Sequence, residues 1–217
     1  MIKGFIFDLD GVLVDTPNLH FEAWCKAAKS INIDLHKSQY EKLKGLSREA
    51  SLLHILDYGN ASLSNRDFQA LMTKKNDWYL EMISSMTSGD ILSGARKFLD
   101  VSKDLKLKIA LGSASQNARK ILDLVNLSQY FDTIIDGTQT SKSKPDPQVF
   151  QFGASELNLQ PQSIVVFEDS IAGVKAANDG GFKSIGIGNK ATLVKANRVY
   201  PSLSEVSPSE VIGNFTH

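Results

Sequence analysis

The 217-residue chain contains a single cysteine, Cys25. An intramolecular disulfide needs two cysteines, so the small secreted folds that depend on disulfide bonds are excluded. Cys25 has no partner motif beside it and is expected to be a buried or incidental thiol. At roughly 100–200 residues per domain, the length indicates one large domain or one domain with an insertion.

An excess of charge is also missing, because 24 Lys and Arg balance 24 Asp and Glu. Binding to a phosphate backbone normally needs a cationic surplus, so we expect no nucleic-acid partner. Apolar runs remain well short of the roughly 18 residues of a membrane span, and two aspartates interrupt the N-terminal run where a secretory signal would continue. We therefore expect a cytoplasmic protein without a membrane partner. The balanced composition is compatible with the monomer that we expect.

Five short apolar runs are typical of buried strands, and helical patterns lie between several of them. The runs are residues 2–7, 107–113, 132–137, 163–170 and 183–188. The helical patterns are residues 115–126, with Ser115 as a candidate N-cap, 147–158, and 170–179, which ends at two glycines. This alternation predicts an α/β fold with a doubly wound, Rossmann-like parallel sheet.

Residues 16–88 break the alternation, since they contain helical stretches and no clear strand. The stretches are about 18–31, 36–43, 47–58 and 64–86. Such a segment after the first strand indicates an inserted helical bundle. We predict a core domain made of residues 1–15 and 89–217, and an inserted all-helical domain made of residues 16–88.

Carboxylates follow two of the predicted strands, at the sheet edge where parallel α/β folds bind ligands. Asp8 and Asp10 end the first strand, and Glu168 and Asp169 end the strand at 163–167. Two like charges ~4 Å apart repel by about 4 kcal/mol at an effective dielectric near 20. A hard cation would relieve this repulsion, and an all-oxygen ligand set suits Mg²⁺.

Two further residues at this edge suggest a phosphate site. Ser113 precedes the helical pattern after the second strand, so helix amides would complete an anion site, and Lys144 adds a positive charge. A carboxylate nucleophile, a metal and a lysine together indicate phosphoryl transfer. Taken singly, Asp-x-Asp is usually a turn, Ser113 an N-cap and Lys144 a solvated loop charge. Their conjunction at strand ends favours the functional interpretation.

These motifs together resemble the haloacid dehalogenase superfamily, and the resemblance covers nearly the whole chain. It is carried by FDLDGV at 7–12, Asp-Thr at 15–16, Ser113, Lys-Pro at 144–145 and Glu-Asp-Ser at 168–170. The resemblance implies that Asp8 forms an aspartyl phosphate, that Asp10 is the general acid and base, and that the inserted helices are a mobile cap. It implies one Mg²⁺ held by the Asp8 carboxylate, the Asp10 carbonyl and Asp169, with Glu168 close by. Ser113, the Ala114 amide and Lys144 would hold the phosphoryl oxygens.

The cap is similar to that of the β-phosphoglucomutase family, through residues 15–24, 43–49 and 75–77, and in the core through 112–117. By this resemblance Arg48 would bind the distal phosphate with help from Asn117, and Thr16 and His20 would assist Asp10. The residues implied for the sugar pocket and cap are Trp24, Lys44, Gly45, Leu46, Ser51, Lys75 and Asn76. Singly, His20 and Trp24 could pack against the bundle one helical turn apart, and Lys75 could lie on a solvated face.

The implied activity is interconversion of β-D-glucose 1-phosphate and glucose 6-phosphate, with β-glucose 1,6-bisphosphate as intermediate and activator. The partner would be a small sugar phosphate. A sugar-phosphate phosphatase with the same carboxylates is the alternative, differing only in whether water or a sugar hydroxyl accepts the phosphoryl group. A non-enzymatic phospho-receiver module is a third hypothesis, against which the helical insertion argues.

Overall fold

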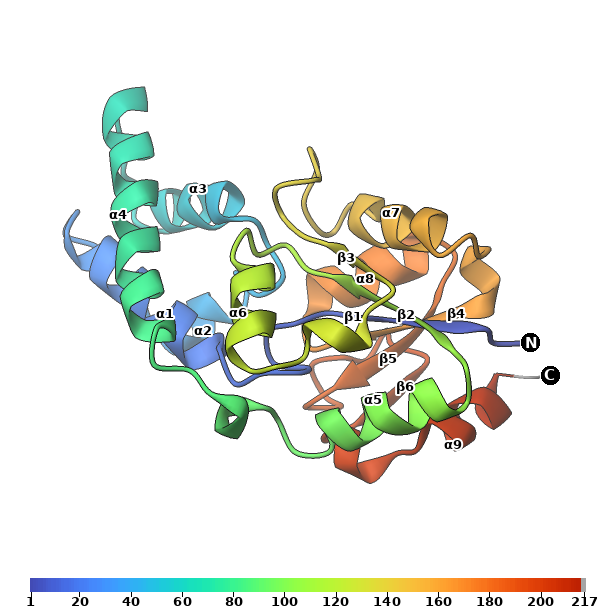
Figure 1. Cartoon of the computed structure of the whole chain (residues 1–217). Coiled ribbons are helices and arrows are strands. Elements are labelled where there is room, and N and C mark those ends of the chain that lie inside the picture. The colour runs from blue at the N-terminus through green and yellow to red at the C-terminus, as the bar shows by residue number, and fades with distance from the viewer. Residues whose placement is uncertain (216–217) are drawn as a thin grey trace.

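The computed structural model describes residues 1–215 and contains a six-stranded parallel sheet, with strand order β3-β2-β1-β4-β5-β6 within that part of the chain (Figure 1). The strands are β1 (Gly4–Phe7), β2 (Lys108–Gly112), β3 (Thr133–Ile135), β4 (Ile164–Glu168), β5 (Lys183–Ile187) and β6 (Arg198–Tyr200). Phe7 pairs with Leu111 on one side and Phe167 on the other, so the central strands end level with one another. The predicted α/β class is confirmed.

Helices cover both faces of the sheet. Phe7 points to one face, where its ring stacks on Phe167 at 4.6 Å, and Ile6 points to the other. The first face is covered by α5 (Ala95–Asp104), α6 (Ala118–Leu124) and α9 (Pro208–Asn214), and the second by α7 (Gln148–Glu156) and α8 (Ile171–Asp179). Figure 1 shows these two layers above and below the strands. Both faces are therefore buried, as a parallel sheet requires.

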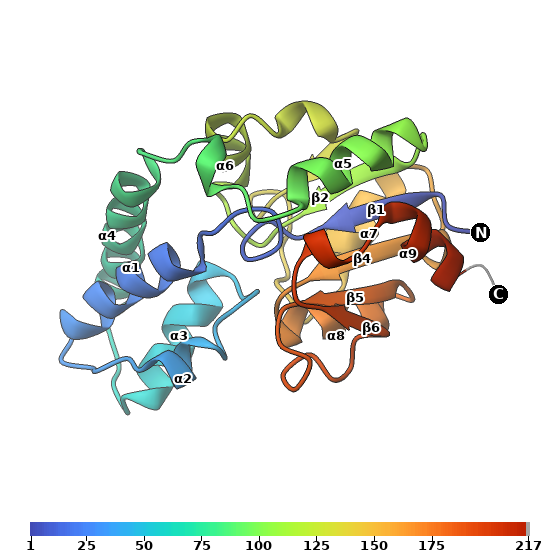
Figure 2. The same ribbon diagram turned by 90° about the horizontal axis from the view of Figure 1, so that it is seen from below.

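Four helices lie between β1 and α5 in the chain and have their own apolar cluster, which contains Trp24, Leu52 and Ile55. They are α1 (Pro17–Lys29), α2 (Lys37–Tyr40), α3 (Arg48–Tyr58) and α4 (Asn65–Ile83). In Figures 1 and 2 they lie beyond the carboxyl ends of the strands. The separate cluster supports a helical cap, but the domain limits at residues 15–16 and 88–89 stay a prediction.

The structure corrects one predicted helix start. The helix expected over 115–126 begins at Ala118, and Asn117 rather than Ser115 is at its N-cap position. The hydroxyl of Ser115 accepts a bond from the Asn117 amide at 3.2 Å, and that of Ser113 from the Ser115 amide at 3.1 Å. These two successive turns, each closed by a serine hydroxyl, take the place of the first helical turn, so the helix begins only at Ala118.

Other elements were not predicted, namely α5, α9 and β6. Residues 198–200 are a short segment between polar stretches, and they pair with β5 along one edge. Short 3₁₀ turns complete the chain at Ser88–Asp90, Ser128–Tyr130, Pro161–Ser163 and Leu203–Glu205. Over residues 1–215, the helices lack the combination of length and apolar character that a membrane span needs.

Candidate active site

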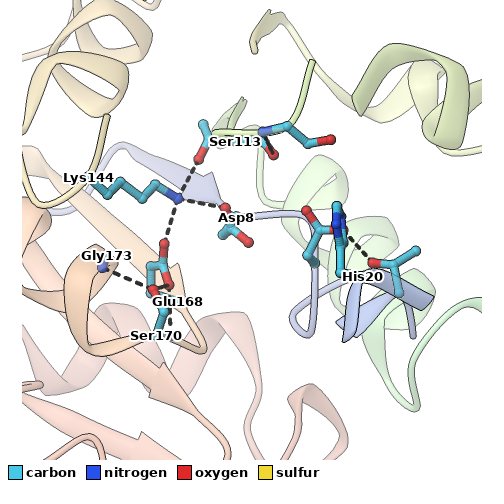
Figure 3. Close-up of polar contacts among 11 residues, drawn as sticks. Asp8, His20, Ser113, Lys144, Glu168, Ser170 and Gly173 are labelled. Carbon is cyan, nitrogen blue, oxygen red and sulfur yellow. Dashed lines mark hydrogen bonds and ion pairs between the residues drawn. The ribbon is translucent and has the colours of Figure 1, made fainter. Parts of the chain in front are cut away.

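Lys144 lies at the centre of a buried ionic cluster at the carboxyl ends of β1 and β4 (Figure 3). Its ammonium donates to Asp8 Oδ1 at 2.6 Å, to Glu168 Oε1 at 2.5 Å and to the Gly112 carbonyl at 3.1 Å. Burial alone would lower the pKa of Lys144, but the charges of Asp8 and Glu168 raise it, so it remains a cation. The alternative of a solvated loop lysine is wrong, because the side chain is completely buried.

Local backbone structure fixes Glu168. Its Oε2 accepts bonds from the Ser170 amide at 2.9 Å and the Ser170 hydroxyl at 2.8 Å, and Ser170 caps α8 by accepting from the Gly173 amide at 3.0 Å. A Cβ at Gly173 would overlap the Glu168 carboxylate, so only glycine lets the helix start so close. The Glu-Asp-Ser motif therefore both ends a strand and begins a helix around one carboxylate.

Carboxylate oxygens of Asp8, Glu168 and Asp169 lie within 4.8 Å of one another. Burial raises the pKa of Asp8, against the opposing effect of Lys144 and with the help of Glu168. Burial and then the charge of Glu168 raise the pKa of Asp169 to about 8. One lysine thus leaves negative charge uncompensated, and these all-oxygen donors fit Mg²⁺. The Asp10 carboxylate is not in this group, so only its backbone carbonyl remains a predicted ligand.

The Asp10 carboxylate instead faces Thr16 and His20. Asp10 Oδ1 accepts a bond from the Thr16 hydroxyl, and His20 Nε2 lies 3.4 Å from the same oxygen. Burial by itself would raise the pKa of Asp10, but the charge and hydrogen bond of His20 lower it overall. The two predicted assistants therefore both contact the predicted general acid and base.

His20 is held from two further sides. Its ring stacks on Tyr79 with centroids 3.9 Å apart, and its Nδ1 lies 3.1 Å from Lys75 Nζ. Burial and then the neighbouring Lys75 lower the pKa of His20, with Asp10 opposing. Tyr79 was not singled out from the sequence, although it follows Lys75 by one helical turn on α4.

Lys75 is buried between aromatic rings and not on a solvated face. Its ammonium lies 4.8 Å from the Trp24 ring centroid and 4.7 Å from that of Tyr79. Burial, followed by the charge of Arg48, lowers the pKa of Lys75 to about 7. Trp24 therefore packs inside the bundle and also borders the site, so both interpretations of it hold.

Arg48, Asn76 and Asn117 connect the cap with the core. The Arg48 guanidinium donates to Asn76 Oδ1 at 2.6 Å, and the Asn117 side-chain amide donates to the same oxygen at 3.0 Å. Arg48 begins α3, Asn76 lies on α4 and Asn117 precedes α6. Three segments that are far apart in the chain thus meet at one oxygen atom.

A second contact between cap and core lies in the loop before α3. Lys44 Nζ is 3.1 Å from Glu41 Oε2 and 3.6 Å from Asp169 Oδ2. Gly45 has φ +76°, and a Cβ there would overlap the Ser170 hydroxyl. Glycine is thus required for the loop to approach the core.

A cavity of about 580 Å³ separates the cap from the core. The predicted site residues that line it are Asp8, Asp10, His20, Trp24, Lys44, Gly45, Leu46, Arg48, Ser51, Lys75, Asn76, Ala114, Asn117 and Asp169. The predicted residues Thr16, Ser113, Lys144 and Glu168 are buried behind this wall. Ser113 is therefore close to the site but five residues before the first helical residue of α6, which corrects the expected helix-terminal position. The lining also includes residues 140–143, which sequence reasoning missed.

Comparisons with known proteins show the family to which the chain belongs. Residues 5–187 match the family model described as haloacid dehalogenase-like hydrolase. A Bacillus subtilis protein named beta-phosphoglucomutase is 38% identical over 208 residues, which cover 95% of this chain and 92% of that protein. A Thermotoga maritima protein named phosphorylated carbohydrates phosphatase is 28% identical over 215 residues, 97% of either chain.

A solved structure is similar along the whole chain. The crystal structure of a beta-phosphoglucomutase from Clostridium difficile superposes with a TM-score of 0.96 at 38% identity, covering 100% of this chain and 98% of that one. The family match and the alignment with the Bacillus subtilis protein both span well over half of the sequence. This chain therefore belongs to the haloacid dehalogenase-like hydrolase family.

Proposed function

We propose that this protein is a β-phosphoglucomutase, which interconverts β-D-glucose 1-phosphate and glucose 6-phosphate through β-glucose 1,6-bisphosphate. The observation that carries the proposal is a cavity with groups suited to phosphate at two ends. Asp8 lies at one end with Lys144 behind it, and Arg48 and Asn117 lie at the other. A substrate that turns around between two phosphoryl transfers needs both ends.

In the first half-reaction, phosphorylated Asp8 transfers its phosphoryl group to the 6-hydroxyl of β-glucose 1-phosphate. The new bond joins phosphorus to the sugar oxygen, the bond from phosphorus to Asp8 breaks, and Asp10 takes the hydroxyl proton. After the bisphosphate has turned around, the Asp8 carboxylate attacks the 1-phosphate. Asp10 then returns its proton to the departing sugar oxygen, and glucose 6-phosphate leaves.

The residues behind these two carboxylates position them. Lys144 holds one Asp8 oxygen through its ammonium at 2.6 Å and leaves the other carboxylate oxygen for the substrate. Thr16 and His20 hold Asp10, and Lys75 and Tyr79 hold His20 in turn. A proton acceptor that is fixed by several neighbours pays no reorientation cost during the transfer.

Asp8, Asp169 and the Asp10 carbonyl would hold Mg²⁺, with Glu168 beside them. When bound, the ion would offset the mutual repulsion of the carboxylates and the charge of the phosphoryl oxygens. Ser113, the Ala114 amide and Lys144 would bind these oxygens from the protein side.

A phosphatase is the second candidate, because the same machinery appears in relatives named for that activity, the Thermotoga maritima protein among them. The two reactions differ in the acceptor that reaches phosphorylated Asp8. The contacts of Lys44 with Asp169 and of Gly45 with Ser170 would close the site and limit access of water. Closure favours transfer to a bound sugar over hydrolysis.

Phosphorus NMR tests the proposal. Wild-type protein is incubated with β-glucose 1-phosphate, Mg²⁺ and a trace of β-glucose 1,6-bisphosphate, and in parallel with the α anomer. We expect glucose 6-phosphate to accumulate from the β anomer while the bisphosphate is regenerated. Release of inorganic phosphate without glucose 6-phosphate would establish the phosphatase instead. Omitting Mg²⁺ should stop both reactions.

A further inference from the structure

Lys142 lies in the loop between β3 and α7, which sequence reasoning did not include in the site. Residues 140–143 of this loop line the same cavity as Arg48 at the start of α3. In Figure 1 the loop is the yellow segment between α3 and α7. The Lys142 side chain is 67% exposed, so its ammonium has room to move toward a ligand in the cavity.

The backbone of this loop is fixed although its tip is exposed. Gln148 Oε1 accepts bonds from two successive amides, those of Ser141 at 2.8 Å and Lys142 at 2.9 Å. Asp146 accepts from the Gln148 amide through Oδ1 at 3.0 Å, and its Oδ2 lies 3.4 Å from Lys142 Nζ. Gln148 at the start of α7 therefore holds the backbone of Lys142 at the cavity wall, and Asp146, just before that helix, contacts its side chain.

Two of the cationic side chains at the cavity, Lys44 and Lys75, have partners that leave them unavailable for a phosphate. Among the lining residues that the structure describes, the cationic side chains are Lys44, Arg48, Lys75 and Lys142. Lys44 lies between Glu41 and Asp169, and Lys75 is buried against His20 and two aromatic rings. Arg48 is held by the neutral Asn76, and Lys142 by an exposed ion pair with Asp146 of the kind that contributes little.

A phosphate monoester carries about 1.5 to 2 negative charges near neutral pH, more than one arginine neutralises. We propose that Lys142 is a specificity-determining residue that binds, together with Arg48, the substrate phosphate remote from Asp8. This inference rests on the proposed function and deepens it, since it assigns the second charge at the distal end of that site. On binding, Lys142 exchanges its contact with Asp146 for one with a phosphate oxygen, while Gln148 keeps the loop in place.

The test uses two phosphoryl donors that differ only in the distal phosphate, glucose 1,6-bisphosphate and glucose 1-phosphate. Donation to Asp8 is followed as the initial rate at which the sugar product appears, glucose 6-phosphate from the bisphosphate and glucose from the monophosphate. It is measured for Lys142→Gln and for the matched control Lys97→Gln, an exposed lysine on α5 outside the cavity. We expect the ratio of kcat/KM for bisphosphate to that for monophosphate to fall about five- to ten-fold in Lys142→Gln, through KM, and not in the control. Added salt should reduce the difference from wild type, because screening weakens an exposed contact.

The outcomes separate this inference from its alternatives. An equal loss with both donors would mean that Lys142 only shapes the loop, and an unchanged ratio would mean that it is a solvated charge; either result overturns the proposal. Gln148→Ala is the second variant, and release of the loop should lower the same ratio by a smaller factor. Because both donors phosphorylate Asp8 whether a sugar or water is the later acceptor, failure of the mutase assay does not affect this comparison.

Discussion

Single residues in this site owe their chemistry to burial. Lys144 remains charged because two carboxylates surround it, whereas Lys75 faces rings and a histidine and has a pKa of about 7. Both are lysines in polar stretches of the sequence, and nothing in those stretches distinguishes them. The environment of each ammonium decides whether it balances the charge of Asp8 and Glu168 or lies beside the ring of His20.

Asp8→Asn tests the nucleophile directly. An amide cannot accept the phosphoryl group, so turnover of sugar phosphates should fall by about 10³-fold or more. Intact-mass spectrometry after incubation with glucose 1,6-bisphosphate should detect a phosphoryl adduct on wild type and none on the variant. A thermal melt checks that the variant is folded, and turnover within ten-fold of wild type by a folded variant would refute the assignment.

The lowered pKa of Lys75 predicts that the stability of the protein depends on pH. Its pKa is about 7 in the folded chain against an ordinary value of 10.5, so the unfolded chain binds more protons between these limits. The free energy of unfolding of wild type should therefore rise with pH across this window, relative to Lys75→Met, by up to about 1.4 kcal/mol per pH unit. Below pH 7 Lys75 is protonated in both the folded and the unfolded chain. The stability of wild type and that of Lys75→Met should therefore depend on pH in the same way there.

Denaturant titrations at several pH values in the presence of a chelator provide the measurement. The control is Lys74→Met, which removes the neighbouring, exposed lysine of α4 and should keep the wild-type dependence. Parallel curves for wild type and Lys75→Met would show that Lys75 keeps an ordinary pKa. The difference between the two proteins also removes the contribution of Asp169, which both share.

At the scale of elements, the site depends on where helices and loops begin. Arg48 is the first residue of α3, directly after the Ser47 cap, and Asn117 is the last residue before α6. Asn76 on α4 accepts from both, so three element positions determine one end of the cavity. The other end is set by β1, β4 and the loop that carries Lys144.

Arg48→Ala tests the distal end of the cavity. Loss of the guanidinium should lower kcat/KM for glucose 1,6-bisphosphate by about 50-fold, because a charge-assisted contact to phosphate disappears. Acetyl phosphate has no distal phosphate, so its turnover should fall far less. Arg66→Ala on the exposed part of α4 is the matched control. Equal losses with both donors would remove Arg48 from the distal-phosphate role.

The whole molecule consists of a parallel α/β core and a helical insertion that meets it across the cavity. Two apolar clusters lie in the core and a third in the insertion, and Ala23, Tyr79 and Ile83 of the insertion pack on the core. Polar contacts between the two parts include those of Thr16 and His20 with Asp10, of Lys44 with Asp169 and of Asn76 with Asn117. Gly45 approaches Ser170 closely in the same region. The position of the insertion therefore controls how much of the site water can reach.

Gly45→Ala should disturb this closure. At φ +76° an alanine is strained by about 1 kcal/mol, and its methyl group would overlap Ser170, so the loop should retreat from the core. The ratio of inorganic phosphate to glucose 6-phosphate formed should rise about ten-fold, because more water reaches phosphorylated Asp8. Gly213→Ala on α9, where an added Cβ meets nothing within 4 Å, is the control. An unchanged ratio would show that this contact does not exclude water.

Much of the architecture was predictable because it follows from local pattern. Apolar runs of six to eight residues alternate with helical spacing, which specifies strands, helices and hence a parallel sheet with ligands at its carboxyl edge. Strand β6 (Arg198–Tyr200) was not predicted, because a strand of three residues at the sheet edge is too short to show a clear apolar pattern. The start of α6 was misplaced because Ser113 and Ser115 form turns instead of a cap.

The sequence by itself determined which reactive groups the protein has and that strands would deliver Asp8, Asp10, Glu168 and Asp169 to one edge. Only the tertiary structure decided their states and partners. It turned the Asp10 carboxylate toward His20, buried Lys75 among aromatic rings, joined Arg48 to Asn117 through Asn76, and set Lys142 on the cavity wall. The reason is physical: charge, burial and phosphate affinity depend on which distant segments meet, and short-range patterns in the chain do not encode those meetings.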